Sequence, residues 1–91
     1  MNFSDLVTIP AEVMARQVGT ETVILDLTSG TYFGLNATGA RMWQFMERGE
    51  RLSSICDMLI DEFDVTRETL ERDLEGLVRD LADKGLISLS S

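Results

Sequence analysis

The stretch TSGTYFGLNATGARMW, Thr28–Trp43, holds an aromatic pair between two glycines and then changes its periodicity. The cluster TSG is a turn signal because serine and glycine favour tight turns. The next five residues, 31–35, alternate Phe33 and Leu35 on one face against Tyr32 on the other. This stretch therefore predicts a turn followed by a short strand.

Two further strand patterns precede this stretch. VMARQV over 13–18 suits a short strand, and TVILDL over 22–27 alternates its side chains between two faces. The segment GTE between them predicts a turn, so the pair forms a hairpin. We therefore expect three short antiparallel strands in succession.

After the third strand the apolar period changes from two to about 3.6 residues, which predicts helices. Asn36 or Thr38 is suited to cap a first helix that runs to about Glu47. The segment LSSICDMLIDEF, 52–63, carries its apolar residues on one stripe and predicts a second helix, capped by Ser53 or Ser54.

The third helix has the clearest boundary signals. Thr66 is its expected N-cap, and Glu68 stands in the first turn, where the helix dipole favours an acid. Lys84 and Gly85 mark its end, which gives a length of about 17 residues. Its apolar stripe is centred on four leucines: Leu70, Leu74, Leu77 and Leu81.

Three strands followed by three helices predict an α+β domain in which the helices cover one face of a three-stranded antiparallel sheet. This order resembles a winged helix-turn-helix. We expect residues 1–12, which include Pro10, to form a flexible N-terminal arm and residues 13–91 to form the domain. The terminal LISLS is expected to lie against the sheet or the helix ends.

Composition removes most catalytic chemistry. The chain has 91 residues, no His and a single Cys, Cys56. An intrachain disulfide, a Cys/His metal site and a Cys-His or Ser-His pair are all excluded, so we expect neither an enzyme nor a bound cofactor. The N-terminus lacks a basic region before an apolar run, and no apolar stretch approaches the ~20 residues of a membrane helix. We therefore expect a cytoplasmic protein.

Charge opposes nucleic-acid binding. The chain has a net charge of -8, and the predicted third helix would have to offer basic residues to DNA. Instead its acids outnumber its bases: Glu68, Glu71, Asp73, Glu75, Asp80 and Asp83 against Arg67, Arg72, Arg79 and Lys84. The acids stand at the ordinary spacing of a solvated helix surface, which also disfavours a carboxylate-based enzyme.

The predicted third strand is an outer strand, so it offers unpaired backbone groups to an extended partner. A peptide can add there as a further strand. Two alternatives stay open on pattern alone. In the first, Phe33 and Leu35 are merely core residues and the N-terminal arm covers the edge. In the second, the edge pairs with the same edge of a second copy and forms a homodimer.

Four segments carry a family resemblance: VILDLTSGTYFGLNATGARMW, SSICDMLIDEFDV, LERDLEGLVRDL and KGLI. Together they resemble the PqqD-like family of RiPP recognition elements, small domains that bind the leader region of ribosomally made precursor peptides. The resemblance covers about residues 13–88, and its most specific part is the run from Asp26 to Trp43. Asp73, Leu77 and the GL at Gly85 match the end of the family pattern.

The resemblance implies that a leader peptide pairs antiparallel to the third strand and lies between that strand and the third helix. Carried over, the peptide-binding residues are Tyr32, Phe33, Gly34 and Leu35 on the strand and Asp73, Gly76, Leu77 and Asp80 on the helix. Gly76 costs a helix interior roughly 1 kcal/mol relative to Ala. Close approach by another chain or a tight contact inside the fold would explain its presence.

The departures from the family pattern bear on the pathway. The quinone-pathway member usually shows a YPEG-like turn and a Cys-Asp-Gly after its first helix, where this chain has LTSG and MERGE. The family usually places Thr or Ser before the second helix, where this chain has Arg51. The chain is more similar to stand-alone B1-type proteins of lasso peptide clusters, whose partner is a leader peptidase. The alternatives are a chaperone for a radical SAM maturation enzyme, including the quinone pathway, and a winged-helix transcriptional regulator.

Overall fold

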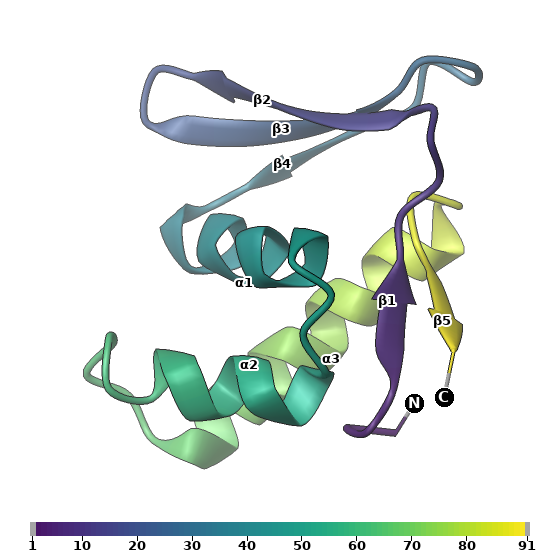
Figure 1. Cartoon of the computed structure of the whole chain (residues 1–91). Coiled ribbons are helices and arrows are strands. Elements are labelled where there is room, and N and C mark those ends of the chain that lie inside the picture. Colours follow the sequence, from purple (N-terminus) through teal and green to yellow (C-terminus); the bar gives the residue numbers. More distant parts are fainter. Residues whose placement is uncertain (1, 91) are drawn as a thin grey trace.

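A computed structural model of the chain describes residues 2–90 and confirms the predicted α+β fold (Figure 1). Its elements follow in chain order: β1 (Leu6–Thr8), β2 (Val13–Val18), β3 (Glu21–Asp26), β4 (Tyr32–Leu35), α1 (Ala37–Glu47), α2 (Leu52–Leu59), α3 (Arg67–Asp83) and β5 (Ser88–Ser90). No described helix is long and apolar enough to cross a membrane.

Strands β2, β3 and β4 form the predicted three-stranded antiparallel sheet in sequence order. Figure 1 shows the three helices on one side of this sheet. Ile24 lies on the helix-facing side of β3 and is fully buried. Val23 and Leu25 lie on the opposite side, as strand alternation requires, and are only half-buried.

The polar caps of α1 and α3 form as the sequence predicts. Of the two candidate caps for α1, Asn36 is the one used, and its Oδ1 accepts the Gly39 N–H at 2.8 Å. Thr66 caps α3 by accepting the Thr69 N–H at 3.2 Å. Both contacts satisfy N–H groups that the first helical turn leaves without a partner.

The core lies where the three helices meet beneath the sheet, and its largest member is Trp43 of α1. On α3 the buried row contains Leu70, Leu74, Leu81 and Val78. The sequence analysis placed Leu77 at the centre of this row, and this was wrong by one position. Val78 faces the core, while Leu77 is half-buried on the side of α3 towards β4.

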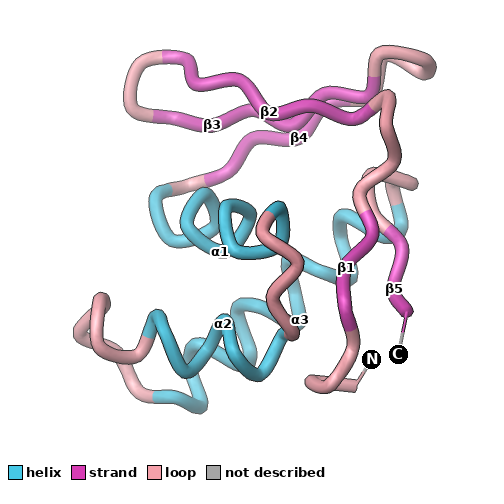
Figure 2. Tube along the Cα trace, viewed as in Figure 1, coloured by secondary structure: helices cyan, strands magenta, loops and turns pink. Residues whose placement is uncertain are grey.

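A second sheet of two strands, β1 and β5, was not predicted (Figure 2). Val7 of β1 pairs with Leu89 of β5, and Val7 belongs to the buried core. The terminal segment LISLS therefore pairs with a strand near the N-terminus of the chain. Residues 6–8 belong to the fold, which differs from the flexible arm expected over 1–12.

Segment 2–5 also caps α2. The Leu52 N–H donates to the Asp5 carbonyl at 3.2 Å, and the Ser53 N–H donates to the Phe3 carbonyl at 2.8 Å. Arg51 is the N-cap residue, its side chain makes no capping bond, and its guanidinium instead donates to the Ser4 carbonyl. The predicted Ser53 or Ser54 cap was wrong because backbone carbonyls of a distant segment perform this role.

Helix α2 ends at Leu59, four residues earlier than predicted. Acidic side chains directly after it oppose the negative end of the helix dipole. One of them, Glu62, instead forms an ion pair with Arg41 of α1 at 2.7 Å. Phe63 still packs on the core, from a turn that follows the helix.

Deletion of residues 2–9 should destabilise the fold by roughly 3 kcal/mol, because it removes the two backbone hydrogen bonds that cap α2 and the buried side chain of Val7. Denaturant unfolding monitored by Trp43 fluorescence measures this change. Thr8→Ala, at an exposed position of β1, is the control and should change stability by less than about 0.5 kcal/mol. A truncated chain as stable as the full one would contradict the structural role of this segment.

Candidate functional site

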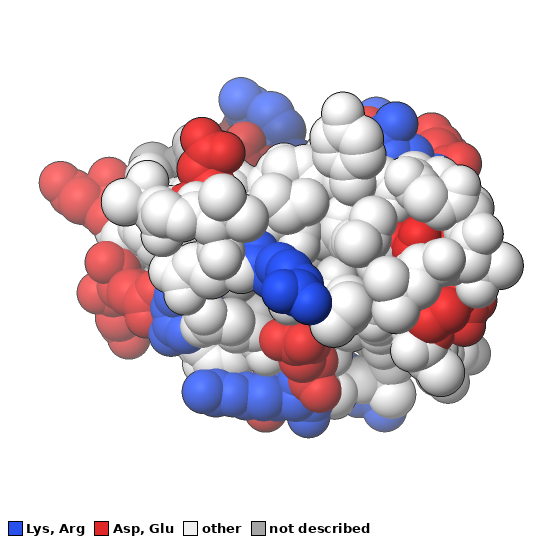
Figure 3. All heavy atoms as spheres, turned by 90° about the horizontal axis from the view of Figure 1, so that it is seen from above, with Lys and Arg blue, Asp and Glu red and all other residues white. Residues whose placement is uncertain are grey.

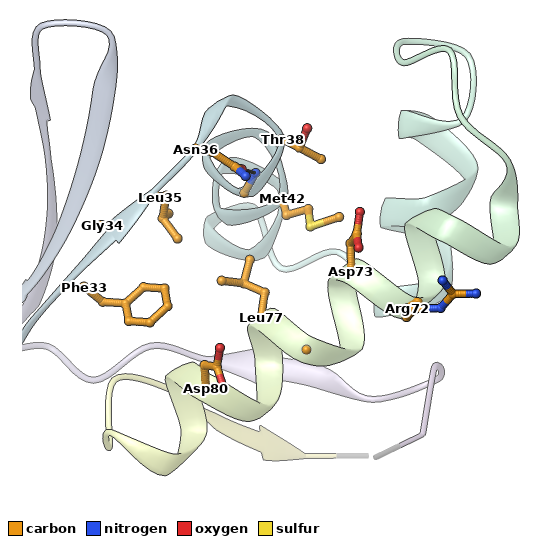
Figure 4. A pocket seen from close by; sticks show the side chains of 12 residues that line it. Phe33, Gly34, Leu35, Asn36, Thr38, Met42, Arg72, Asp73, Leu77 and Asp80 are labelled. Carbon is orange, nitrogen blue, oxygen red and sulfur yellow. Dashed lines mark hydrogen bonds between the residues drawn. The ribbon is translucent and has the colours of Figure 1, made fainter.

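A groove of about 450 Å³ lies between β4, the start of α1 and α3 (Figure 4). It collects residues from three separate parts of the sequence: Phe33, Gly34, Leu35, Asn36, Thr38, Gly39, Met42, Arg72, Asp73, Gly76, Leu77 and Asp80. Every residue that the sequence singled out lines this groove except Tyr32.

The outer edge of β4 has no partner strand within residues 2–90, because β1 pairs with β5 instead of covering it. The Asp26 N–H donates to the Thr31 carbonyl at 2.8 Å, so residues 26 and 31 form a hydrogen-bonded pair of the ladder. Bonded and non-bonded pairs alternate along antiparallel strands. Tyr32 and Gly34 therefore direct their backbone N–H and C=O groups outward, along the groove.

The side chains of β4 divide between two faces. Phe33 and Leu35 point to the helices and form one wall of the groove. The Tyr32 side chain lies on the other face and is 72% exposed. The predicted contact of Tyr32 is therefore restricted to its backbone, and its ring is not part of the groove.

Apolar side chains meet in the middle of the groove. Figure 4 shows Leu77 of α3 pointing towards Met42 of α1, with Phe33 and Leu35 on the strand side. Met42 and Leu35 are buried, whereas Leu77 and Phe33 are half-buried and keep part of their surface free. This surface suits an apolar side chain of a ligand, because binding would remove the remaining apolar area from water.

Charged groups line the helix side of the groove. Asp73 and Asp80 are exposed, and their carboxylates have no hydrogen bond or ion pair with residues 2–90. Arg72 stands beside them but pairs with Glu68 at 3.5 Å. Lys84 holds its Nζ 6.0 Å from the centre of the Phe33 ring. The groove therefore combines an apolar middle with an acidic helix wall.

Gly76 lies half-buried on α3 and lines the groove. A Cβ added to it would meet no atom within 4 Å. The fold therefore does not need glycine here for a tight internal contact, which removes one of the two explanations that the sequence left open. The space over Gly76 opens into the groove.

The sequence missed the contribution of α1 and one basic residue: Asn36, Thr38, Gly39, Met42 and Arg72. Thr38 and Met42 stand one helical turn apart, so they share a face of α1. That spacing was available in the sequence. It became informative only when the fold placed this face opposite α3.

The turn that leads into β4 is held by Asp26. Its Oδ1 accepts the Thr28 N–H at 2.8 Å and the Ser29 N–H at 3.3 Å. The Thr28 bond is the main cause that lowers the pKa of the Asp26 carboxyl, desolvation opposes it, and the Ser29 bonds add to it. Gly30 then adopts a φ of 76°, a left-handed conformation that favours glycine.

Metal-binding side chains do not gather in the described part of the chain. Within residues 2–90, no three His, Cys, Asp or Glu side chains are placed to hold a metal ion. Cys56 is buried on α2, and this burial raises the pKa of its thiol. The arrangement of the groove is suited to binding an extended chain.

The outer face of the main sheet carries a second, separate surface. In cross-strand register Met14, Leu25 and Tyr32 form one row, and Arg16, Val23 and Gly34 form the next. Figure 3 looks onto this side of the molecule and shows a broad area of uncharged atoms interrupted by basic atoms near its centre. Met14 and Tyr32 are exposed there. We call these two rows the outer sheet face.

Comparisons with known proteins agree on the fold. A family model described as coenzyme PQQ synthesis protein D (PqqD) matches residues 21–87. The solved structure of TbiB1 in complex with the TbiA(beta) leader peptide is 42% identical and superposes with a TM-score of 0.81, over 89% of this chain and 94% of that one. A lasso peptide synthetase B1 complexed with the leader peptide is 30% identical, with a TM-score of 0.81 over 90% and 96% of the two chains. No curated protein gives a significant sequence match.

The lowered pKa of Asp26 makes a prediction about acid stability. A carboxyl whose pKa is lowered by folding stabilises the fold above its ordinary pKa and loses this contribution as pH falls through the lowered value. Because the ordinary pKa is 3.8 and folding lowers it, we expect stability to fall more steeply for the native chain than for Asp26→Asn between pH about 5 and about 2. Thermal unfolding at a series of pH values measures this. Parallel curves for the two proteins would contradict the role of the carboxylate in the turn.

Proposed function

This chain belongs to the PqqD family, and we propose that it is a non-catalytic adaptor that binds the leader region of a ribosomally synthesised precursor peptide. We further propose that it acts in the cytoplasm and presents the bound leader to a maturation enzyme, a lasso leader peptidase. The single observation that carries the proposal is the open edge of β4 beside a groove, in a fold shared with two B1 chains seen in complex with leader peptides.

The geometry suggests how the leader binds. An extended leader pairs antiparallel to β4 through the outward backbone groups of Tyr32 and Gly34. Its alternate side chains then point into the groove, where Phe33 and Leu77 provide apolar surface. Backbone bonds supply a general affinity for extended chains, and the groove supplies selection among side chains.

The outer sheet face supports the presentation step. A leader paired to β4 would extend this face by one strand and leave the rows of Met14 and Arg16 free. Apolar surface that stays exposed in a small monomeric domain often marks a protein contact. We propose that the maturation enzyme docks on the outer sheet face and contacts the outward side chains of the leader at the same time.

The family description names coenzyme PQQ synthesis, which keeps open the alternative from the sequence analysis, a chaperone for a radical SAM maturation enzyme. We prefer the lasso leader peptidase because the turn before β4 reads LTSG and because both matched structures are B1 proteins. A winged-helix regulator is disfavoured, since the exposed side of α3 mixes acids and bases in pairs such as Arg79–Glu75.

The open edge of β4 also permits a homodimer, because the same backbone groups can pair with β4 of a second copy. In that case the leader competes with the second copy. Sedimentation with and without leader separates the two uses, since leader binding would dissociate an edge-paired dimer.

The leader encoded by the precursor gene beside the gene for this chain tests the proposal. We expect this peptide, added to isotope-labelled protein, to shift amide resonances within 31–35 and 70–82. It should bind with no chemical change to the peptide. Shifts confined to other residues, or no binding, would overturn the proposed function.

Two substitutions refine this test. Gly34→Pro removes an outward N–H without breaking the β3–β4 ladder, so leader affinity should fall at least about tenfold while the domain stays folded. Gln17→Pro is the matched control, because register gives Gln17 an outward N–H on the opposite edge of the sheet. Leu77→Arg should weaken binding similarly by placing a charge in the apolar middle. Unchanged affinity in Gly34→Pro and Leu77→Arg would remove the groove from the model.

Met14→Glu on the outer sheet face separates leader binding from presentation. We expect leader affinity to stay within about twofold, while the rate of leader removal by the partner peptidase falls at least about tenfold. Met58→Glu is the control, because Met58 on α2 has a similar exposure of 37% against 36% for Met14. Equal processing rates for the two variants would show that the outer sheet face is not the docking surface.

A further inference from the structure

Helix α3 satisfies most of its exposed charges within itself. Three glutamates of the helix each pair with an arginine one turn away: Arg67–Glu71 at 3.2 Å, Arg72–Glu68 at 3.5 Å and Arg79–Glu75 at 3.2 Å. Asp73 and Asp80 differ, because their carboxylates have no such partner within residues 2–90 and both line the groove. The groove therefore presents two negative charges that the fold leaves uncompensated.

Gly76 lies between these two carboxylates. With a rise of 1.5 Å per residue, it stands about 4.5 Å along the axis from Asp73 and about 6 Å from Asp80. Figure 4 shows both aspartates on the groove side of α3, on either side of Leu77. Because a Cβ at residue 76 would touch nothing, the absent side chain leaves an open notch with an acid at each end. We call this the Gly76 notch.

Two basic groups lie near the notch, and each has another neighbour. Arg72 pairs with Glu68 at 3.5 Å, and the Nζ of Lys84 lies 6.0 Å from the centre of the Phe33 ring. Beside the notch lies the half-buried side chain of Leu77. The site thus offers apolar contact to the stem of a long side chain and negative charge to its head, which is the chemistry of Lys or Arg.

We propose that the Gly76 notch is the subsite for one basic side chain of the leader, with its stem across Gly76 and Leu77 and its charged head between Asp73 and Asp80. This proposal rests on the proposed leader-binding function and adds the chemical class that the groove selects. Gly76 is then a specificity-determining residue, kept for the space that it leaves open.

Strand alternation restricts where this basic residue stands in the leader. Only leader residues on the same face as Phe33 and Leu35 point towards α3, and these are alternate residues. The basic residue and the apolar residue that contacts Leu77 and Met42 are therefore separated by an even number of positions. A basic residue shifted by one position would point to the outer sheet face.

The carboxylates are tested with the leader of the adjacent precursor gene and with peptides in which each basic residue in turn is norleucine. Asp73→Asn combined with Asp80→Asn should weaken binding of the native leader roughly tenfold at low salt, and less at high salt. One norleucine peptide should bind the native and doubly substituted proteins equally. Glu75→Gln is the control. It lies on α3 outside the groove and removes one negative charge, as each of the two Asn substitutions does, and it should change leader affinity little.

The notch itself is tested by size. Gly76→Ala should raise the unfolding midpoint, because alanine is the better helix former and the space is empty. Gly76→Leu should also stay folded but should weaken leader binding at least about tenfold, since its side chain fills the notch. The loss of affinity caused by Gly76→Leu should be smaller for the norleucine peptide that lacks the basic residue of this subsite.

The outcomes separate the two proposals. If the native protein binds the leader, and Gly76→Leu and the double asparagine variant bind it equally well, the basic subsite is wrong and the adaptor function stands. If the double asparagine variant weakens leader binding no more than Glu75→Gln does, the electrostatic attraction is general to the acidic surface and the subsite is also wrong. If the native protein does not bind the leader, the proposed function itself fails.

Discussion

Within residues 2–90, strand β4 is paired on one side only, and the site depends on this constraint. Its inner backbone groups are held by β3, and its two ends are fixed by the Asp26 turn and by Asn36, which caps α1 directly after the strand. The free edge is therefore held in extended form by contacts within the fold before any ligand binds. A preorganised edge limits the entropy lost on binding, which favours recognition of a flexible peptide.

Strand alternation places the two faces of β4 in different surroundings. Phe33 and Leu35 close the groove against the helices, while Tyr32 and Gly34 belong to the outer sheet face and offer their backbone groups at the edge. A leader strand added there inherits this division. In the proposed function, side chains on one face of the leader contact the groove, and those on the other face remain available to the maturation enzyme. A single added strand then contacts both proteins.

The second sheet, formed by β1 and β5, lies beside the helix layer (Figure 1) and packs on the core through Val7 and Leu89. Strand β1 places Val7 in the core. The residues before β1 cap α2 through the backbone carbonyls of Phe3 and Asp5, which accept hydrogen bonds from the first turn of that helix. Within residues 2–90 the outer edge of β4 has no partner strand, and β1, the strand that precedes this sheet in sequence, pairs with β5.

Sequence determined the features that depend on near neighbours along the chain. The change of period after Leu35, the Thr66 cap and the bounds of α3 follow from local propensity and capping, and all were predicted. The family resemblance paired a strand and a helix as a candidate site, and the structure places these two elements on either side of one groove. Only tertiary structure decided the rest, because those features depend on partners distant in sequence. These are the pairing of β1 with β5, the backbone caps of α2, the outward direction of the Tyr32 ring and the empty space over Gly76.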